Sequence, residues 1–208
     1  MSRRQIRGGQ KISKPRARRQ EHRKFLVVTE GTRTEPQYFE KLAALLNAKA
    51  VQVVKVKPVG IGRDPASVVK EAERRRRQER KGGDPFDEVW CVVDVDQHET
   101  LPRACKEARD LGIEMAISSP CFEIWLLWHF EDRTRWIDAG ELKKLLGKQG
   151  FADKNVPENF PYGEHGLAAG RAAACEPIVR PHVPPNPSSS VASLVASLVR
   201  ARGGGRTG

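Results

Sequence analysis

This 208-residue chain lacks long apolar runs, paired cysteines and nucleotide-binding glycine motifs. Its longest apolar run, residues 124–130, is too short to cross a bilayer and includes His129. No apolar segment of the kind found in signal peptides follows the basic start. The glycines at 60 and 62 match neither the Walker A nor the dinucleotide fingerprint, so we interpret their segment as a connecting loop. The four cysteines show no CxxC spacing, and we interpret them as reduced thiols of a cytoplasmic protein that does not enter membranes.

The chain also has fewer acidic than basic residues: 26 Asp and Glu against 37 Lys and Arg, which gives a net charge of +11. The excess is concentrated in residues 1–24, which hold ten Lys and Arg against one Glu. That segment has a net charge of +9, which leaves only +2 for the rest of the chain. We expect residues 1–24 to form a disordered basic arm, which either binds phosphates non-specifically or only keeps the protein soluble.

Short β-branched apolar runs alternate with helical stripes along the rest of the chain. We expect strands near 25–28, 51–59, 89–93 and 113–117, and helices near 34–46, 66–81 and 99–111. This alternation predicts an α/β fold with a mainly parallel sheet of about four strands flanked by helices. We divide the chain into the arm 1–24, a core 25–135, a helical and loop extension 136–200 that completes the domain, and a flexible tail 201–208.

Acidic side chains follow two of the expected strands. Asp94 and Asp96 come directly after the strand at 89–93, and they would project together from the carboxyl edge of the sheet, where open α/β sheets bind ligands. Glu30 ends the first strand and Glu35 begins the next helix, so both should face the same edge. Carboxylates held close together repel one another unless a cation lies between them, and Mg²⁺ or Mn²⁺ suits oxygen ligands. The alternative is that Asp96 caps a turn and Asp94 is solvated.

The motif SSPCFEIWLLWHF begins as many helices do, with Ser119 as the expected N-cap and Pro120 as the first helical residue. Within residues 122–128 nearly every side chain is apolar, so the helix would be apolar on nearly all its faces, which predicts that it is buried. Glu123 is the exception, and it is either a favourable acid in the first turn or a further metal ligand. Near the end of the chain, residues 186–190 are expected to cap a last helix that begins at Val191.

Basic side chains are candidates for nucleic-acid contacts. Four consecutive arginines lie within the helix expected at 66–81: Arg74, Arg75, Arg76 and Arg77. The glutamates around them favour intrahelical ion pairs on a solvated face, and the alternative is a surface that follows a phosphate backbone. Arg33 is a further candidate, close to Glu30 and Glu35. Four lysines of the extension could also contact phosphate or be ordinary surface residues: Lys143, Lys144, Lys148 and Lys154.

The order of these motifs resembles two related groups of proteins. Glu30-Gly31, Glu35 and Asp94-x-Asp96, within this strand pattern, resemble the Toprim domain of topoisomerases, primases and overcoming-lysogenization-defect (OLD) nucleases. The segments EGTRTEPQYFEKL, VVDVDQH, SSPCFEIWLLWHF and NPSSSVASLV resemble more closely the RloB-like family, over about residues 24–200. The resemblance implies a Toprim-like, Rossmann-like fold with a C-terminal helical extension.

The resemblance also implies a function: a divalent-metal-dependent nuclease of a prokaryotic anti-phage defence system, which hydrolyses phosphodiesters in DNA or RNA beside a partner ATPase of the AAA or ABC type. By motif, the implied metal ligands are Glu30, Glu35, Asp94 and Asp96, with Lys154 as a catalytic lysine. Glu30 and Glu35 are five residues apart where the nucleases commonly show four. Family members usually read Ser-Asn-Pro where this chain has Ser118-Ser119-Pro120.

The implied chemistry follows from charge, because two metals held by carboxylates can activate a water and stabilise the departing oxygen, with Lys154 or an arginine adding a positive contact. The second hypothesis is a non-catalytic nucleic-acid-binding or regulatory subunit of such a system. A primase-like phosphotransfer enzyme is less favoured, since no nucleotide-binding motif is present. The sequence leaves open whether the chain forms a homodimer.

Overall fold

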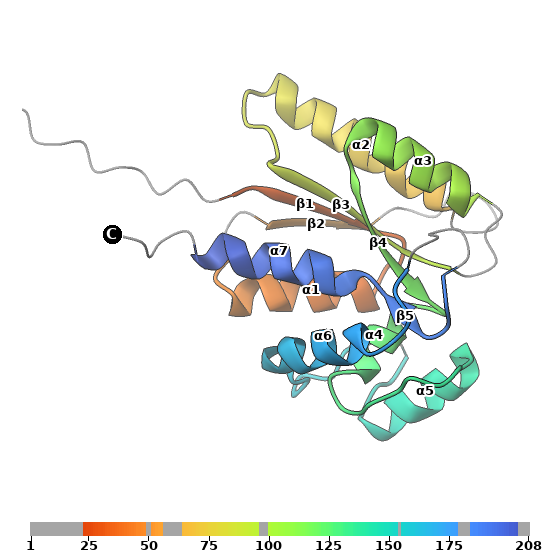
Figure 1. Cartoon of the computed structure of the whole chain (residues 1–208). Coiled ribbons are helices and arrows are strands. Elements are labelled where there is room, and N and C mark those ends of the chain that lie inside the picture. Colours follow the sequence, from red (N-terminus) through yellow and green to blue (C-terminus); the bar gives the residue numbers. More distant parts are fainter. Residues whose placement is uncertain are drawn as a thin grey trace, which may run out of the picture.

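The computed structural model describes residues 23–48, 51–55, 64–95, 100–153, 155–178 and 184–203, and its centre is a five-stranded sheet (Figure 1). The strands are β1 (Phe25–Thr29), β2 (Val51–Lys55), β3 (Glu88–Asp94), β4 (Glu114–Ser119) and β5 (Ser188–Ser189). They lie in the order β2-β1-β3-β4-β5. All neighbours are parallel except β5, which pairs antiparallel with β4.

Helices cover both faces of this sheet. Figure 1 shows α2 and α3 on one face and α1 and α7 on the other, with α4, α5 and α6 grouped beyond α1 and α7. The helices are α1 (Thr34–Leu45), α2 (Pro65–Lys81), α3 (Leu101–Leu111), α4 (Glu123–Leu127), α5 (Ala139–Lys148), α6 (His165–Ala173) and α7 (Val191–Gly203), with a short 3-10 helix at Tyr162–Glu164. None of the described helices is long and apolar enough to cross a membrane.

The apolar run of β1 is buried because the strand lies in the middle of the sheet with helices on both faces. Alternate side chains of a strand point to opposite faces. Phe25 and Val27 therefore join the core under α1, α4 and α7, while Leu26 and Val28 join the core under α2 and α3. All four side chains are fully buried. The continuous apolar run is thus what a central parallel strand requires.

The two central strands, β1 and β3, lie at the point where the chain changes direction across the sheet. From β1 the chain passes through α1 to β2 on one side, and then through α2 on the opposite face to β3 on the other side of β1. Such a switch point leaves a crevice outside the carboxyl ends of the two strands, where open α/β proteins bind ligands. Glu30 and Asp94 stand at those two ends.

The C-terminal segment adds structure that the sequence did not predict. Ser188 and Ser189 form the short fifth strand, and of the two only Ser189 also serves the expected cap: its Oγ accepts from the amide of Val191, where α7 begins as predicted, at 3.3 Å. The Oγ atoms of Ser118 and Ser189 lie 2.9 Å apart. Asn186 does not cap a helix: its amide donates to the Ile137 carbonyl (2.9 Å) and accepts from the Ile137 amide (3.2 Å). The segment therefore completes the edge of the sheet and fixes the chain before α5.

The start of α4 also differs from our prediction. Ser119 is the last residue of β4 and pairs with Ser188, so it is not an N-cap, and Pro120 lies in the turn that follows. The helix begins at Glu123, after a cis Ser119-Pro120 bond, with Phe122 in the N-cap position. The α/β architecture itself is confirmed, with one more strand than expected. The arm up to residue 22, the segment 56–63 with its glycines, and residues 204–208 lie outside the described residues.

Candidate functional site

The ends of β1 and β3 bring Glu30 and Asp94 together. Thr29 pairs with Val92, and the Glu30 amide donates to the Val92 carbonyl at 3.0 Å. This register places the Glu30 side chain beside the next strand, where Oε2 accepts from the Asp94 amide at 3.4 Å. The sequence predicted that both acids lie at this edge, and the structure places them in contact.

Glu35 reaches the same place from the first turn of α1. The Thr29 hydroxyl donates to the Gly31 carbonyl at 2.8 Å and shapes the turn between strand and helix. The Glu35 carboxylate then lies directly against the Gly31 backbone, in the space that a Cβ at position 31 would occupy. Glu30 and Glu35 are each only 7% exposed. The motif Glu-Gly-x-x-x-Glu therefore has a structural reason, since only glycine leaves room for the second carboxylate.

A Gly31→Ala substitution is expected to displace the Glu35 carboxylate while keeping the fold. The new methyl group overlaps the far end of a flexible side chain, which can rotate away at small cost in stability. If Glu35 contributes to cation binding, the Kd for Mn²⁺ should rise by about tenfold, as when a supporting group of a metal site is lost. Isothermal titration with Mn²⁺ measures this. An unchanged Kd would contradict a role for Glu35 in binding.

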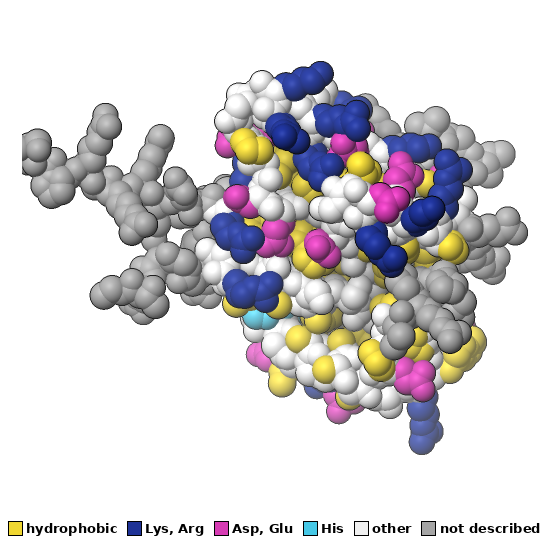
Figure 2. All heavy atoms as spheres, turned by 45° about the horizontal axis from the view of Figure 1, so that its top comes forward, with side chains coloured by type: hydrophobic (Ala, Val, Ile, Leu, Met, Phe, Trp, Pro, Cys, Tyr) yellow, Lys and Arg dark blue, Asp and Glu magenta, His cyan; other side chains and the backbone are white. Residues whose placement is uncertain are grey.

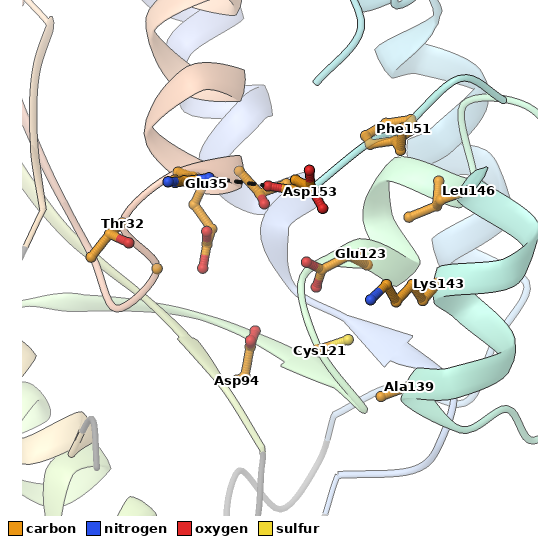
Figure 3. A pocket seen from close by; sticks show the side chains of 13 residues that line it. Thr32, Glu35, Asp94, Cys121, Glu123, Ala139, Lys143, Leu146, Phe151 and Asp153 are labelled. Atoms are coloured by element: carbon orange, nitrogen blue, oxygen red, sulfur yellow. Dashed lines mark hydrogen bonds between the residues drawn. The ribbon is translucent and has the colours of Figure 1, made fainter. Parts of the chain in front are cut away.

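Glu123 and the turn before it form the third side of the site. The Phe122 amide donates to Asp94 Oδ1 at 2.8 Å, so the start of α4 fixes the orientation of the Asp94 carboxylate. Glu123 is the first residue of α4 and points into the same cavity (Figure 3). Cys121 lines the cavity beside it. Sequence reasoning found Glu123 because it is charged among apolar neighbours, but it gave no signal for Cys121.

A cavity of about 490 Å³ lies between the sheet edge and α5, and its lining includes Glu35, Asp94, Cys121 and Glu123. Glu30 is not part of that lining but contacts the Asp94 amide beside it. Glu35 and Asp94 point toward each other across the cavity in Figure 3, and Glu123 faces them from α4. The opposite wall is formed by α5 and the loop after it, with Lys143 and Phe151 among its residues. A volume of this size falls within the range of small-molecule sites.

Burial and charge raise the pKa of Asp94 well above its ordinary value of 3.8. Burial is the main cause, followed by the charges of Glu35, Glu123 and Glu30, and the hydrogen bond from the Phe122 amide opposes the shift only in part. Burial also raises the pKa of the Cys121 thiol, and the neighbouring carboxylates add to this effect. Further negative charge in the cavity is therefore unfavourable, and a positive charge there would reduce the repulsion among the carboxylates.

Two basic side chains line the cavity as well. Arg33 donates from Nη1 to the Asp153 carbonyl at 3.4 Å, which joins the loop before α1 to the loop after α5. Lys143 lies on α5, is exposed, and extends its amine toward the cavity beside Glu123 (Figure 3). In the sequence Lys143 was one of four equivalent lysines. Lys143 differs from the other three because it lies one helical turn from Ala139 and from Leu146, which also line the cavity.

Two predicted site residues, Asp96 and Lys154, lie outside the described residues, so their roles stay predictions. Within the described ranges, no three His, Cys, Asp or Glu side chains are grouped so that they could hold a metal ion. The structure places Glu30, Glu35, Asp94 and Glu123 near one another and Arg33 in the cavity lining, and their roles stay predictions.

The four arginines of α2 lie on the opposite face of the sheet from α4 and α5 (Figure 1). Arg74 and Arg75 both pair with Glu71, at 2.6 and 2.9 Å, while Arg76 and Arg77 both pair with Glu73. Figure 2 shows this face with basic and acidic side chains interspersed. The predicted intrahelical pairing is confirmed, and the proposed contact of these arginines with nucleic acid stays a prediction.

The fold and the site define a class of α/β proteins: those with a mainly parallel sheet, helices on both faces of that sheet, and an acidic cavity at the carboxyl edge of the central strands. Within that class, the chain belongs to the RloB-like protein family, whose model matches residues 25–198. A comparison with the curated proteins finds no match, and neither does one with the solved structures.

Proposed function

We propose that this protein is a divalent-metal-dependent nuclease of a prokaryotic anti-phage defence system, which works with a partner ATPase. The observation that carries the proposal is the gathering of Glu35, Asp94 and Glu123 around one cavity with Glu30 beside Asp94, where burial and then the neighbouring carboxylates raise the pKa of Asp94. Acidic residues with a strongly shifted pKa in a cleft are common at catalytic and binding sites. Membership of the RloB-like family supports the defence role through the resemblance described above.

The donor set fits a hard cation. The side chains at the site are carboxylates, which suit Mg²⁺ or Mn²⁺. The Cys121 thiol stays protonated because its pKa is raised, so it does not supply the thiolate that softer metals select. Glu30, Glu35, Asp94 and Glu123 are the described residues that would hold the ion, and Asp96 would join them. No three of the described side chains are grouped closely enough to hold an ion as they stand, so binding would require them to move toward one another.

The chain's own residues have distinct parts in phosphodiester hydrolysis. The Phe122 amide orients the Asp94 carboxylate, and the Asp94 amide in turn contacts Glu30, so both acids are positioned by backbone groups. Lys143 can approach a phosphate oxygen and offset the negative charge that builds on it. A bound Mg²⁺ or Mn²⁺ would polarise the phosphate and lower the pKa of an attacking water.

The first test is the melting temperature as a function of Mg²⁺ and Mn²⁺ concentration. A cation that binds the native state at a hundred times its Kd stabilises it by about 2.7 kcal/mol, or roughly 5 to 10 °C for a chain of this size. We expect this rise in the wild type and its absence in Asp94→Ala. Asp110→Ala, an exposed acid on α3, is the control and should keep the wild-type response. Equal responses in all three proteins would contradict the site.

The basic surface of α2 and α3 favours a second candidate function, a non-catalytic nucleic-acid-binding subunit. Exposed basic residues include Lys70, Arg74, Arg77 and Lys81, while Glu71 and Glu73 are half-buried. Nucleic-acid affinity that is unaffected by chelator, together with no cleavage under any metal, would favour this function. In that case a protein without residues 1–24 should bind more weakly and show a smaller salt dependence.

A further inference from the structure

The cavity has two chemically different walls. One wall carries the carboxylates of Glu35, Asp94 and Glu123. The other, formed by α5 and the loop after it, presents the apolar side chains of Leu146 and Phe151 (Figure 3). The carboxylates of the first wall would bind the metal ions that hold a phosphodiester. The apolar side chains of the second wall have no part in that binding, and they suit contact with an apolar part of the substrate.

The ring of Phe151 is held in place by other aromatic side chains. It makes edge contacts with Phe130, at 6.4 Å between ring centroids, and with Phe160, at 5.8 Å. Phe160 is buried, whereas Phe151 is partly exposed where it lines the cavity. Such edge-to-face packing fixes the orientation of a ring. Phe151 is therefore an aromatic surface ready to contact a ligand without a large entropic cost.

One helix presents both an apolar contact and a positive charge. Lys143 and Leu146 are three residues apart on α5, so they lie on the same side of the helix, and both line the cavity. The amine of Lys143 extends toward Glu123 and the acidic wall (Figure 3). A ligand with an anionic group next to a flat apolar group matches this arrangement.

We propose that the cavity binds an unpaired nucleotide, with its base against Phe151 and Leu146 and its phosphate between Lys143 and the carboxylates. The volume of about 490 Å³ is in the range of small-molecule sites, which suits a single nucleotide. A base inside a duplex keeps its faces stacked and cannot reach this wall, whereas a splayed base can stack on an aromatic ring. The phosphate position rests on the proposed nuclease function, and the substrate class is therefore single-stranded or locally unpaired nucleic acid.

The test is the affinity for a short fluorescent oligonucleotide, single-stranded or in a blunt duplex of the same sequence, measured by anisotropy with Ca²⁺. A gel run on each sample checks that the oligonucleotide stays intact. We expect the wild type to prefer the single strand by at least about tenfold. Phe151→Ala should weaken single-strand binding by on the order of tenfold, since each stacked base contributes about that much, and Phe151→Trp should restore it.

Phe86→Ala is the matched control, because Phe86 is a partly buried phenylalanine that packs against the core under α2 and α3 and does not line the cavity. It should leave the strand preference unchanged. The oligonucleotides are made as DNA and as RNA, and a preference for the unpaired form in either one supports the proposal. Equal affinity for both forms, no binding of either, or equal effects of the two alanine variants would overturn it.

The melting response to Mn²⁺, measured on the same preparations, separates this proposal from the nuclease function. Phe151→Ala keeps all carboxylates, so it should respond to Mn²⁺ as the wild type does. A wild type that responds to Mn²⁺ but shows no preference for the single strand counts against the unpaired-nucleotide site alone. A wild type without a metal response counts against the nuclease function.

Discussion

An Asp94→Asn variant is expected to melt at a higher temperature than the wild type without metal, and, under the proposed nuclease function, to lose cleavage by on the order of a hundredfold or more. The amide keeps an oxygen that can accept the hydrogen bond from the Phe122 amide, so the local geometry is retained. The substitution removes the negative charge of Asp94, which burial and the carboxylates of Glu35, Glu123 and Glu30 make unfavourable. Each kcal/mol gained raises the melting temperature of a chain of this size by about 2 to 4 °C.

The pH dependence gives an independent check. Because the pKa of Asp94 is raised on folding, the folded protein binds a proton more readily than the unfolded chain does. The metal-free wild type should therefore lose stability from this group as the pH rises through the interval between 3.8 and the raised pKa. The difference in melting temperature between Asp94→Asn and the wild type should grow over the same interval.

Calorimetry in the presence of a chelator measures the difference, and an Asp110→Asn variant on α3 is the control because that side chain is exposed. Addition of Mn²⁺ should reverse the order of the two melting temperatures, since only the wild type gains a bound cation. An Asp94→Asn variant that melts below the wild type without metal would show that the carboxylates do not repel one another at this site.

A Trp128→Ala variant is expected to lose about 3 to 5 kcal/mol of stability and to melt roughly 10 °C lower. Trp128 is fully buried at the end of α4, its Nε1 donates to the Arg133 carbonyl at 2.9 Å, and its own carbonyl accepts from Arg171 at 2.5 Å. Because α4 has only five residues, its position depends on this packing rather than on its own helical hydrogen bonds. Denaturant unfolding measures the change.

Trp136→Ala is a control with the same chemical change, since the Trp136 side chain is 66% exposed. It should alter stability by no more than about 0.5 kcal/mol. The Mn²⁺ affinity of Trp128→Ala should also fall, because α4 carries Glu123 and follows the amide that orients Asp94. Similar losses of stability in the two tryptophan variants would contradict the central place of α4 in the core.

The acidic edge could be predicted because strand patterns and acids coincide in the sequence. A continuous β-branched run ending in Asp94, and another ending at Glu30, are sufficient to place both acids at one edge of a parallel sheet. The same reasoning missed the strand at Ser188–Ser189, since two serines show no periodic apolar pattern. It also placed the start of α4 too early, because Ser119 and Pro120 carry cap signals although pairing with Ser188 keeps Ser119 in β4.

The far wall of the cavity was beyond sequence reasoning for a different reason. Lys143 and its neighbouring lysines are chemically alike, and only the packing of α5 against α4 decides which of them reaches the cavity. Phe151 follows a glycine in a polar loop, where a single aromatic residue gives no periodic signal. Positions of this kind depend on tertiary contacts between distant segments, such as the bond from Arg33 to the Asp153 carbonyl.

The late position of Asn186 and the serines after it has a consequence for protein synthesis. A nascent chain leaves the ribosome from its N-terminus, so Glu30, Asp94 and Glu123 emerge well before residues 186–190. Until those last residues emerge, Ile137 lacks its two bonds to Asn186 and β4 lacks its neighbour on one side. A chain terminated before residue 186 would therefore carry every acidic candidate yet lack the contacts that hold Ile137 and the edge of β4, so that a premature stop would release a protein with an incompletely supported site.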